Sequence, residues 1–308
     1  MMPALTVGLK QLGGKPRITL STKGENSASR LLLGRSRAEA MRLVPLIFNL
    51  CPAAQSAAAA IALGLPPNTQ ADLHIAVETL REHALVMLRE WPVALDRQPD
   101  IAAMTGLAKK FTAQQLDNLE RVVFNGPSDL VLNDFETWMA KSGANIAADL
   151  ATVAQWPKAP GRVAYDSDPT FIGRVIHHPG LKRIIDAEGI TLFARMAARA
   201  IETAALIQEI RSDKIAIRHG TIRNGQGWAE AARGLLTHSA RLRNGLIESY
   251  CIATPTDGMT GNGAFLETLL NSAATAPHTV RRQQMAIAMT CADPCMPVVW
   301  DEEAMRNA

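Results

Sequence analysis

Apolar residues recur along most of the chain at the spacing of amphipathic helices. In residues 70–91 they stand three to four positions apart, which predicts a helix with one buried face. These positions are Leu73, Val77, Leu80, Ala84 and Leu88. A further helical pattern runs from residue 37 to about residue 64, with breaks near Pro45 and Pro52. Weaker helical patterns cover 112–124, 130–155 and 187–212.

Two stretches have the alternating pattern of β-strands instead. Residues 4–21 alternate around the sequence LGGKP, which predicts a short hairpin with a Gly-Gly turn. Residues 234–256 contain Asn244-Gly245 between two alternating runs, and this dipeptide is the strongest short signal for a hairpin. The alternating side chains are Leu236, His238, Ala240 and Leu242 before the turn, and Leu246, Glu248, Tyr250 and Ile252 after it. Pro255 is expected to end the second strand.

The composition agrees with a mainly α fold that has a minor β component of short hairpins. Of the 308 residues, 47% are hydrophobic but only 5% are aromatic, so the core is built mainly from aliphatic side chains, which here are rich in the helix formers alanine and leucine. We expect a single domain over residues 1–308. The loop at 155–169 could divide it into two lobes, at 1–155 and 170–308.

Charge and hydropathy exclude several classes of partner. The chain has 32 basic and 29 acidic side chains, and the basic ones are scattered without interleaved aromatic residues, so we expect no nucleic acid partner. Residues 43–65 carry no charge, but they contain prolines and amides and end in an alanine run, which favours a buried helix over a membrane span. The first twenty residues lack the pattern of a signal peptide. We therefore expect a cytoplasmic protein without a membrane partner.

The four cysteines are too few for a disulfide framework in a chain of this length, and reduced thiols are expected. Cys295 lies between Asp293-Pro294 and Met296-Pro297, a stiff segment that could hold a reactive sulfur or form an ordinary turn. Cys51, taken alone, has the setting of a core cysteine on an alanine-rich helix. Cys251 is expected to pack within the hairpin, and Cys291 with Cys295 forms only a weak candidate metal clip.

The histidines give no clear metal motif. His177-His178 could bind a metal but fits a polar loop better, and His83 next to Glu82 is expected on the solvated face of its helix. The sequence GMTGNGAF at 258–265 lacks the lysine and the helix that a phosphate-binding loop needs. We find no nucleophile and base in a catalytic arrangement.

Three segments resemble motifs of nickel–iron hydrogenase large subunits. The central one, EAARGLLTH at 230–238 followed by Pro255-Thr256, is similar to the family pattern E-A-P-R-G-x-L-x-H that leads through a hairpin to Pro-Thr or Pro-Ser. The sequence LIFNLCPAAQ at 46–55 is weakly similar to the first cysteine motif, R-x-C-G-x-C-x-x-x-H. Asp293-Pro294-Cys295 matches the start of the last one, D-P-C-x-x-C-x-x-H. The three similar segments occur along the chain in the same order as the family's motifs.

The departures from these motifs bear on the metal. The family uses four thiolates, two terminal on nickel and two bridging nickel to iron. Here Cys51 stands at a bridging position and Cys295 at a nickel-terminal one, whereas Phe48 and Val298 replace the other two cysteines. Leu46 and Gln55 replace the arginine and the histidine of the first motif. Because affinity for a soft metal depends on the number and geometry of its ligands, the resemblance implies the family's fold without bound nickel.

The residues that still match the three motifs suit the iron half of the nickel–iron cofactor. The resemblance implies that Arg233 and Thr256 stand where the family hydrogen-bonds the two cyanides of the iron. Cys51 and Cys295 are then the candidate metal ligands, and iron with cyanide and carbonyl ligands, held transiently, is the expected cargo. The pattern is most similar to hydrogenase expression/formation proteins of the HupK and HoxV type, which implies an assembly scaffold rather than an enzyme. The expected partners are hydrogenase maturation proteins, such as a small iron-carrying chaperone, and the hydrogenase large subunit.

Two other functions remain open at this point. The chain could be a small, hydrogenase-like, metal-dependent oxidoreductase that uses its remaining cysteines. It could also be a metal-free chaperone of the maturation complex. The metal content and the infrared bands of iron-bound carbonyl and cyanide distinguish the three functions.

Overall fold

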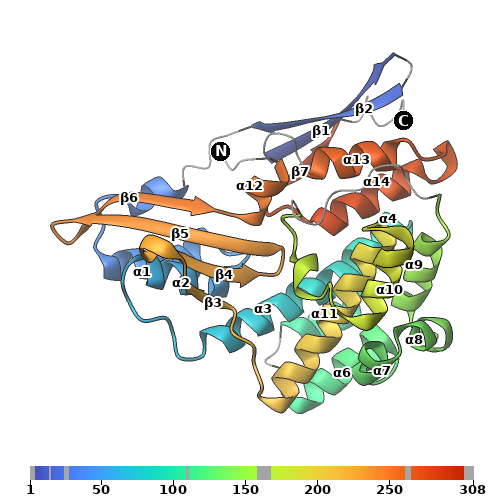
Figure 1. Cartoon of the computed structure of the whole chain (residues 1–308), viewed down its shortest axis with the longest axis horizontal. Helices are drawn as coiled ribbons and strands as arrows, with labels where there is room; N and C mark the ends of the chain where they lie inside the picture. The colour runs from blue at the N-terminus through green and yellow to red at the C-terminus, as the bar shows by residue number, and fades with distance from the viewer. Residues whose placement is uncertain are drawn as a thin grey trace.

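The computed structural model describes residues 4–13, 15–23, 28–108, 111–157, 168–260 and 265–301. Helices form most of the molecule, and two small sheets lie beside them (Figure 1). The prediction of a mainly α fold with a minor β component is therefore confirmed. Most of the loop at 155–169, which could separate two lobes, lies outside the described residues, because these leave out 158–167.

The helical body is built around two long helices, α3 (Ala71–Leu85) and α11 (Leu192–Ser212), which pack against each other. A π-helical turn at Val86–Glu90 continues α3 into the short helix α4 (Trp91–Ala94). Most of α11 is buried because smaller helices surround it. They include α6 (Ala113–Phe124), α7 (Ser128–Asn133), α9 (Asn145–Ala154) and α10 (Pro179–Glu188). The helices α5 (Ile101–Leu107) and α8 (Phe135–Lys141) pack against neighbouring helices.

The four-stranded sheet is antiparallel, with the strand order β3-β4-β5-β6. Its strands are β3 (His219–Thr221), β4 (Gly227–Ala231), β5 (Gly234–Arg243) and β6 (Leu246–Ala253). The predicted hairpin is confirmed: Asn244 and Gly245 form its two-residue turn, and both have positive φ, as a type I′ turn requires. A register shift between Arg241 and Leu242 buries Ile247 and leaves Leu246 half exposed.

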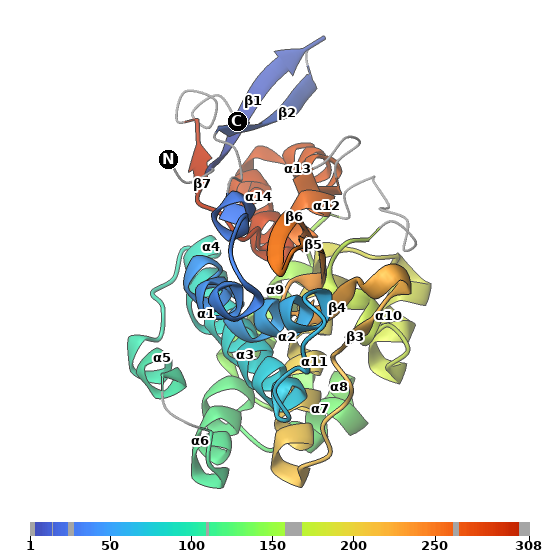
Figure 2. The same ribbon diagram turned by 90° about the vertical axis from the view of Figure 1, so that its left-hand side faces the viewer.

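Helices α1 (Arg37–Ile47) and α2 (Pro52–Ala62) cover this sheet, as seen from the side in Figure 2. The alanine run of α2 allows a close approach, because its small side chains leave room for β4 and β5. A Cβ at Gly227 would lie 2.1 Å from the carbonyl oxygen of Ala58, so this contact requires glycine. The predicted break in the helical pattern of 37–64 is also found, at residues 48–51 between α1 and α2.

The second sheet joins the two ends of the described chain. Its order is β2-β1-β7, in which β1 (Ala4–Leu12) pairs antiparallel with β2 (Lys15–Lys23) and parallel with β7 (Val298–Trp300). The N-terminal hairpin was predicted, and the third strand was not. The sheet lies beside α13 (Phe265–Ala274) and α14 (His278–Ala292) in Figure 1, and α12 (Pro255–Thr260) precedes them. Ile18 N donates to Asn271 Oδ1 at 2.7 Å, which ties β2 to α13.

The uncharged stretch at 43–65 belongs to α1 and α2, as the sequence favoured. In the described part of the chain, no helix combines the length and the apolar character that crossing a bilayer requires.

Candidate functional site

Cys51 occupies the N-cap position of α2, in the break that separates α1 from α2. Pro52 follows it at the first position of the helix, where a proline costs no hydrogen bond. Glu78, on α3, takes over the capping: its carboxylate accepts from Ala53 N at 2.7 Å and from Ala54 N at 3.3 Å. The sulfur of Cys51 is therefore not used as a helix cap. The residue is 7% exposed.

Cys295 is held in a fixed loop between α14 and β7. Asp293 ends α14 in the left-handed conformation, with a φ of 50°. Beyond Cys295, Leu5 N donates to Pro297 O at 2.9 Å and anchors the loop to β1. The backbone N–H of Cys295 itself donates to Thr256 Oγ1 at 2.9 Å. The loop is thus fastened on both sides of the cysteine.

The two sulfurs meet in the interior and share a hydrogen bond. That bond lowers the pKa of Cys295 to about 7 against the effect of burial, with help from the Arg233 guanidinium and the Thr256 hydroxyl. The same bond and burial raise the pKa of Cys51 well above its ordinary value. Near pH 7 about half of the molecules have therefore lost one of the two thiol protons, and the remaining proton is on Cys51, whose thiol donates to the Cys295 thiolate.

Arg233 lies in the tight turn between β4 and β5 and points toward the end of α14. Its Nε donates to Asp293 O at 2.8 Å, and its Nη2 donates to Glu82 Oε2 at 3.0 Å. Burial alone would lower its pKa, but Asp293, the Cys295 thiolate and Glu82 raise it well above the ordinary value. The site therefore always contains a cation.

Thr256 completes the set from the start of α12. The residue is 3% exposed, and its hydroxyl acts on Cys295 twice, accepting from the backbone N–H and donating to the thiolate. The structure thus brings together the four residues singled out in the sequence: Cys51, Cys295, Arg233 and Thr256. They come from the break before α2, the loop after α14, the β4–β5 turn and α12. Their roles toward a metal remain a prediction.

A chain of buried polar groups reaches Cys51 from the hairpin. Gln55 Nε2 donates to Cys51 Sγ at 3.5 Å, and Gln55 Oε1 lies 2.6 Å from His238 Nε2. Burial lowers the pKa of His238 to about 3, so the ring is neutral. With its proton on Nε2, its Nδ1 accepts from the Tyr250 hydroxyl at 2.8 Å. Tyr250 and His238 therefore turn the NH₂ of the Gln55 amide toward the sulfur.

The interpretation of the sequence missed this chain, although a signal was present. His238 and Tyr250 both stood in the alternating runs of the hairpin, so their common inward face could be read from the pattern. Gln55 was noted only as a replacement for the histidine of the family's motif. That its amide would meet His238 depends on how α2 packs on β5, which the sequence alone does not give.

The expectation for His83 was wrong. The ring is fully buried where α3 packs on α11, with Nε2 2.8 Å from Glu202 Oε2 and Nδ1 2.8 Å from Arg199 Nη1. Burial and the Arg199 charge lower its pKa to about 4. Arg174 neutralises Glu202 through two hydrogen bonds. The clue in the sequence was the pair of charged residues, Arg199 and Glu202, among the alanines and other apolar residues in the middle of α11.

The other cysteine and histidine candidates lie outside this group. Cys251 is exposed on β6 rather than packed in the hairpin, so that expectation is wrong. Cys291 is buried on α14, and burial raises its pKa to about 11. His178 serves as the N-cap of α10 and lies 2.9 Å from Leu132 O, in agreement with a polar loop role. The residues 261–264 of the glycine-rich stretch lie outside the described part.

The donor set suits a metal unit that brings most of its own ligands. Among the described residues, no group of three or more histidine, cysteine, aspartate or glutamate side chains could hold a metal ion. Where the hydrogenase family has its other two cysteines, Phe48 packs edge-on against His238, with ring centroids 6.4 Å apart, and Val298 pairs with Leu5 in the sheet. Two sulfurs beside a guanidinium and a hydroxyl fit a low-spin iron with small anionic ligands.

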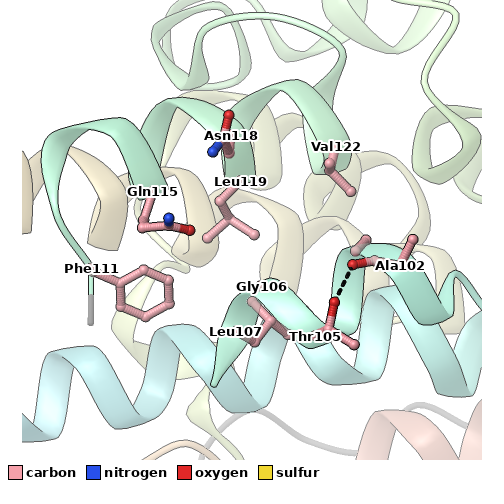
Figure 3. Close-up of a pocket in the computed structure, with 10 residues that line it drawn as sticks. Ala102, Thr105, Gly106, Leu107, Phe111, Gln115, Asn118, Leu119 and Val122 are labelled. Carbon is pink, nitrogen blue, oxygen red and sulfur yellow. Dashed lines mark hydrogen bonds between the residues drawn. The ribbon is translucent and has the colours of Figure 1, made fainter. Parts of the chain in front are cut away.

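A separate pocket of about 220 Å³ lies between α5 and α6 (Figure 3). Leu107, Phe111 and Leu119 form part of its apolar lining, and the amides of Gln115 and Asn118 stand at its side. The lining contains no cysteine, histidine or carboxylate, so it does not add to the chemistry of the thiol pair.

Comparisons with known proteins support the fold. No known family description matches the chain. The chain is similar to the hydrogenase expression/formation protein HupK of Rhodobacter capsulatus, with 28% identity across 99% of each chain.

Solved structures with a similar fold include NiFe and NiFeSe hydrogenases. The NiFeSe hydrogenase of Dm. baculatum superposes with a TM-score of 0.57 at 14% identity, over 94% of this chain and 95% of that one. An NAD⁺-reducing NiFe hydrogenase gives 0.53 at 15% identity, over 91% and 92%. The NiFeSe hydrogenase of Desulfovibrio vulgaris Hildenborough gives 0.53 at 14% identity, over 92% and 94%. The fold is therefore that of hydrogenase large subunits.

Proposed function

We propose that this chain, a relative of HupK with the fold of hydrogenase large subunits, is a maturation factor that carries the iron–cyanide–carbonyl unit of the hydrogenase cofactor. Cys51 and Cys295 are the two sulfur ligands, and Arg233 and Thr256 face the cyanides. The observation that carries the proposal is the meeting of the two sulfurs beside a buried cation, although they are far apart in the chain. The iron unit is cargo, received and passed toward the hydrogenase large subunit.

The geometry supports a transient carrier better than an enzyme. Nickel in the hydrogenase family relies on four thiolates, and two of those positions hold apolar side chains fixed by packing in this chain. A cargo held by two sulfurs leaves with fewer broken bonds than one held by four, which suits transfer. The remaining hydrogen bonds, from Gln55 to Cys51 and from Thr256 to Cys295, stabilise the sulfurs without blocking a further ligand.

Infrared spectroscopy on protein purified anaerobically from its native host tests the proposal. Bands of iron-bound carbonyl and cyanide, with iron near one per chain and without nickel, are the expected result. The same bands with nickel and hydrogen turnover would assign the chain to the oxidoreductases. Absence of the bands from protein purified during active hydrogenase synthesis would leave a metal-free chaperone as the function.

A further inference from the structure

The two sulfurs that meet inside the molecule are close enough to be joined by a covalent bond. A disulfide forms only where two cysteine side chains point at each other across a short gap, because its geometry is narrow. Cys51 and Cys295 meet this condition, since their sulfurs share a hydrogen bond and both are free cysteines. Joining them requires only the closer approach of two sulfurs that are already neighbours.

The backbone at each cysteine holds the two sulfurs at this approach. Directly after Cys51, the Glu78 carboxylate accepts from Ala53 N at 2.7 Å and fixes the start of α2. The backbone N–H of Cys295 donates to the buried hydroxyl of Thr256 at 2.9 Å and fixes the loop after α14. The approach of the sulfurs is thus built into the fold on both sides.

The two cysteines differ in exposure. Cys295 is partly exposed, whereas Cys51 is buried. A small oxidant such as hydrogen peroxide therefore meets Cys295 first. The Cys51 sulfur, in hydrogen-bond contact behind it, is then positioned to close the bond. This is the arrangement of a reactive cysteine with a resolving cysteine beside it.

The other two cysteines are placed differently. Cys251 lies exposed on β6, and Cys291 is buried on α14 near the Arg195 guanidinium of α11. Asp293 ends α14 between Cys291 and Cys295 with a φ of 50°, so the chain changes direction between these two thiols. The fold therefore favours one pair among the four cysteines.

We infer that Cys51 and Cys295 form a reversible disulfide, with a peroxide as the oxidant, and that this bond closes the site to cargo. The Cys295 thiolate attacks one oxygen of hydrogen peroxide, the O–O bond breaks, and the other oxygen takes a proton and leaves as water. The resulting sulfenic acid at Cys295 reacts with the Cys51 thiol, which forms the S–S bond and releases the second oxygen as water. Overall, two thiols are oxidised and one peroxide is reduced to two molecules of water.

The effect on cargo rests on the proposed function. A disulfide uses both sulfurs, so neither is an iron ligand until a dithiol reductant opens the bond by exchange and becomes a disulfide itself. The Arg233 guanidinium near Cys295 stabilises the thiolate that leaves when the bond opens. Bound iron has the opposite effect, because it occupies both sulfurs and protects them from peroxide. The pair thereby couples the loading of cargo to the redox state of its surroundings.

Peptide mapping of the full-length, metal-free protein after treatment with hydrogen peroxide tests the inference. Mass spectrometry without reductant is expected to find the peptides of Cys51 and Cys295 joined, and dithiothreitol is expected to separate them. Cys51→Ser is expected to stop at a sulfenic acid on Cys295, which dimedone traps. Cys295→Ser is expected to slow the oxidation of Cys51 about tenfold or more. The matched control, Cys251→Ser, removes an exposed thiol and is expected to change the rate of disulfide formation less than about twofold.

Three outcomes in the wild type would overturn the inference. These are free thiols at Cys51 and Cys295 after peroxide has oxidised Cys251 in the same sample, a bond from Cys295 to Cys291, or a sulfinic acid at Cys295 beside an unmodified Cys51. The wild-type map decides the question even where a variant does not fold.

Infrared bands of protein purified anaerobically from the native host are measured alongside, before and after peroxide. A disulfide in the metal-free protein, together with no bands in the anaerobic protein, would contradict the proposed function and leave the disulfide in place. Bands in the anaerobic protein without a disulfide in the metal-free protein would contradict the inference alone.

Discussion

Gln55 connects the hairpin to the thiol pair: its amide accepts from His238 Nε2 at 2.6 Å and donates to Cys51 Sγ at 3.5 Å. With the ring proton on Nε2, the amide cannot rotate without losing both bonds, because the neutral imidazole offers only one N–H and that one points at Gln55. The orientation of a single side chain thus decides whether Cys51 faces a donor or an acceptor. A thiolate at Cys51, once iron binds, needs the donor.

Gln55→Leu is expected to destabilise the protein and to alter the iron site. The variant leaves the His238 N–H buried without an acceptor, which costs about 1–3 kcal/mol of unfolding free energy. Loss of the hydrogen bond to sulfur also makes Cys51 a stronger electron donor, so the carbonyl band is expected to shift to lower frequency. Urea unfolding and infrared spectra measure the two effects. Gln114→Leu, at an exposed position on α6, is the control and is expected to change neither.

Arg233→Ala is expected to reduce iron retention far more than Arg241→Ala. Arg233 is buried beside the sulfurs, and its removal leaves Glu82 and Asp293 without their cation, which costs roughly 3–5 kcal/mol. The side chain of Arg241 is 73% exposed, so its loss costs less than about 1 kcal/mol. Arg233→Lys separates charge from geometry, since lysine cannot donate in a fixed fork.

Iron per chain and infrared intensity are the measurements for the arginine variants. Equal retention of iron by Arg233→Ala and Arg241→Ala would mean that the central motif has been assigned incorrectly. Full retention by Arg233→Lys would show that charge alone is sufficient.

Cys51→Ser and Cys295→Ser are each expected to abolish iron binding and hydrogenase maturation in the host while the protein still folds. Serine is a much weaker acid than cysteine and does not replace a thiolate ligand. Cys251→Ser is the matched control, because this thiol is exposed on β6, and it is expected to be neutral. Cys291→Ser is also expected to retain iron. Normal hydrogenase activity in a host that carries only the Cys295→Ser protein would refute the assignment.

Nickel is expected to be nearly absent from the purified protein, with iron at up to one per chain. Phe48 and Val298 occupy the positions of two of the family's cysteines and offer no sulfur ligand. Phe48 packs against His238 instead, and Val298 pairs with Leu5 in the sheet. Elemental analysis of protein from cells grown with added nickel is the measurement. A nickel content near one per chain would contradict the ligand set.

The stability of the protein is expected to depend on pH through His83. Burial and the charge of Arg199 lower the pKa of His83 to about 4. The other charged groups near the ring are Glu202, which is hydrogen-bonded to it, and Arg174, which is paired with Glu202. Between pH 6.5 and 4 the unfolded chain binds a proton at this residue that the folded protein does not. The contribution of His83 is therefore fully present above pH 6.5 and is lost as pH falls, by about 1.4 kcal/mol for each pH unit.

Comparison of the wild type with His83→Gln isolates this contribution from the other titrating groups. Urea unfolding at several pH values between 4 and 8 is expected to give a difference in unfolding free energy that shrinks toward low pH. A difference that stays constant across this range would show that folding does not shift the pKa of His83.

Local signals predicted much of the fold. Asn244-Gly245 determined the second hairpin because both residues accept positive φ, and the apolar spacing of 70–91 determined α3. The strand β7 was missed because its three residues owe their conformation to pairing with β1, not to any local pattern. His83 was misplaced for a related reason: its polar neighbours suggested solvent, but α11 supplies Arg199 and Glu202 as buried partners.

The candidate site was accessible only through the resemblance of three separated motifs. Cys51, Arg233, Thr256 and Cys295 belong to different elements, and no spacing along the chain brings them together. The role of Glu78 could not be predicted, because a carboxylate that caps another helix leaves no pattern in the sequence of its own helix. Packing of α2 on α3 and on the sheet decides these contacts.

The pairing of β7 with β1 has a consequence for the order of events in the cell. Cys51 leaves the ribosome early, but its partner Cys295 follows only after most of the chain, on the order of tens of seconds later. The loop that carries Cys295 is fixed by the hydrogen bond from Leu5 N to Pro297 O. Leu5 cannot form this bond until Pro297 has been synthesised. A nascent chain thus offers one sulfur and no closed site. Loading of cargo with both ligands therefore waits until Cys295 has been synthesised and its loop has paired with Leu5.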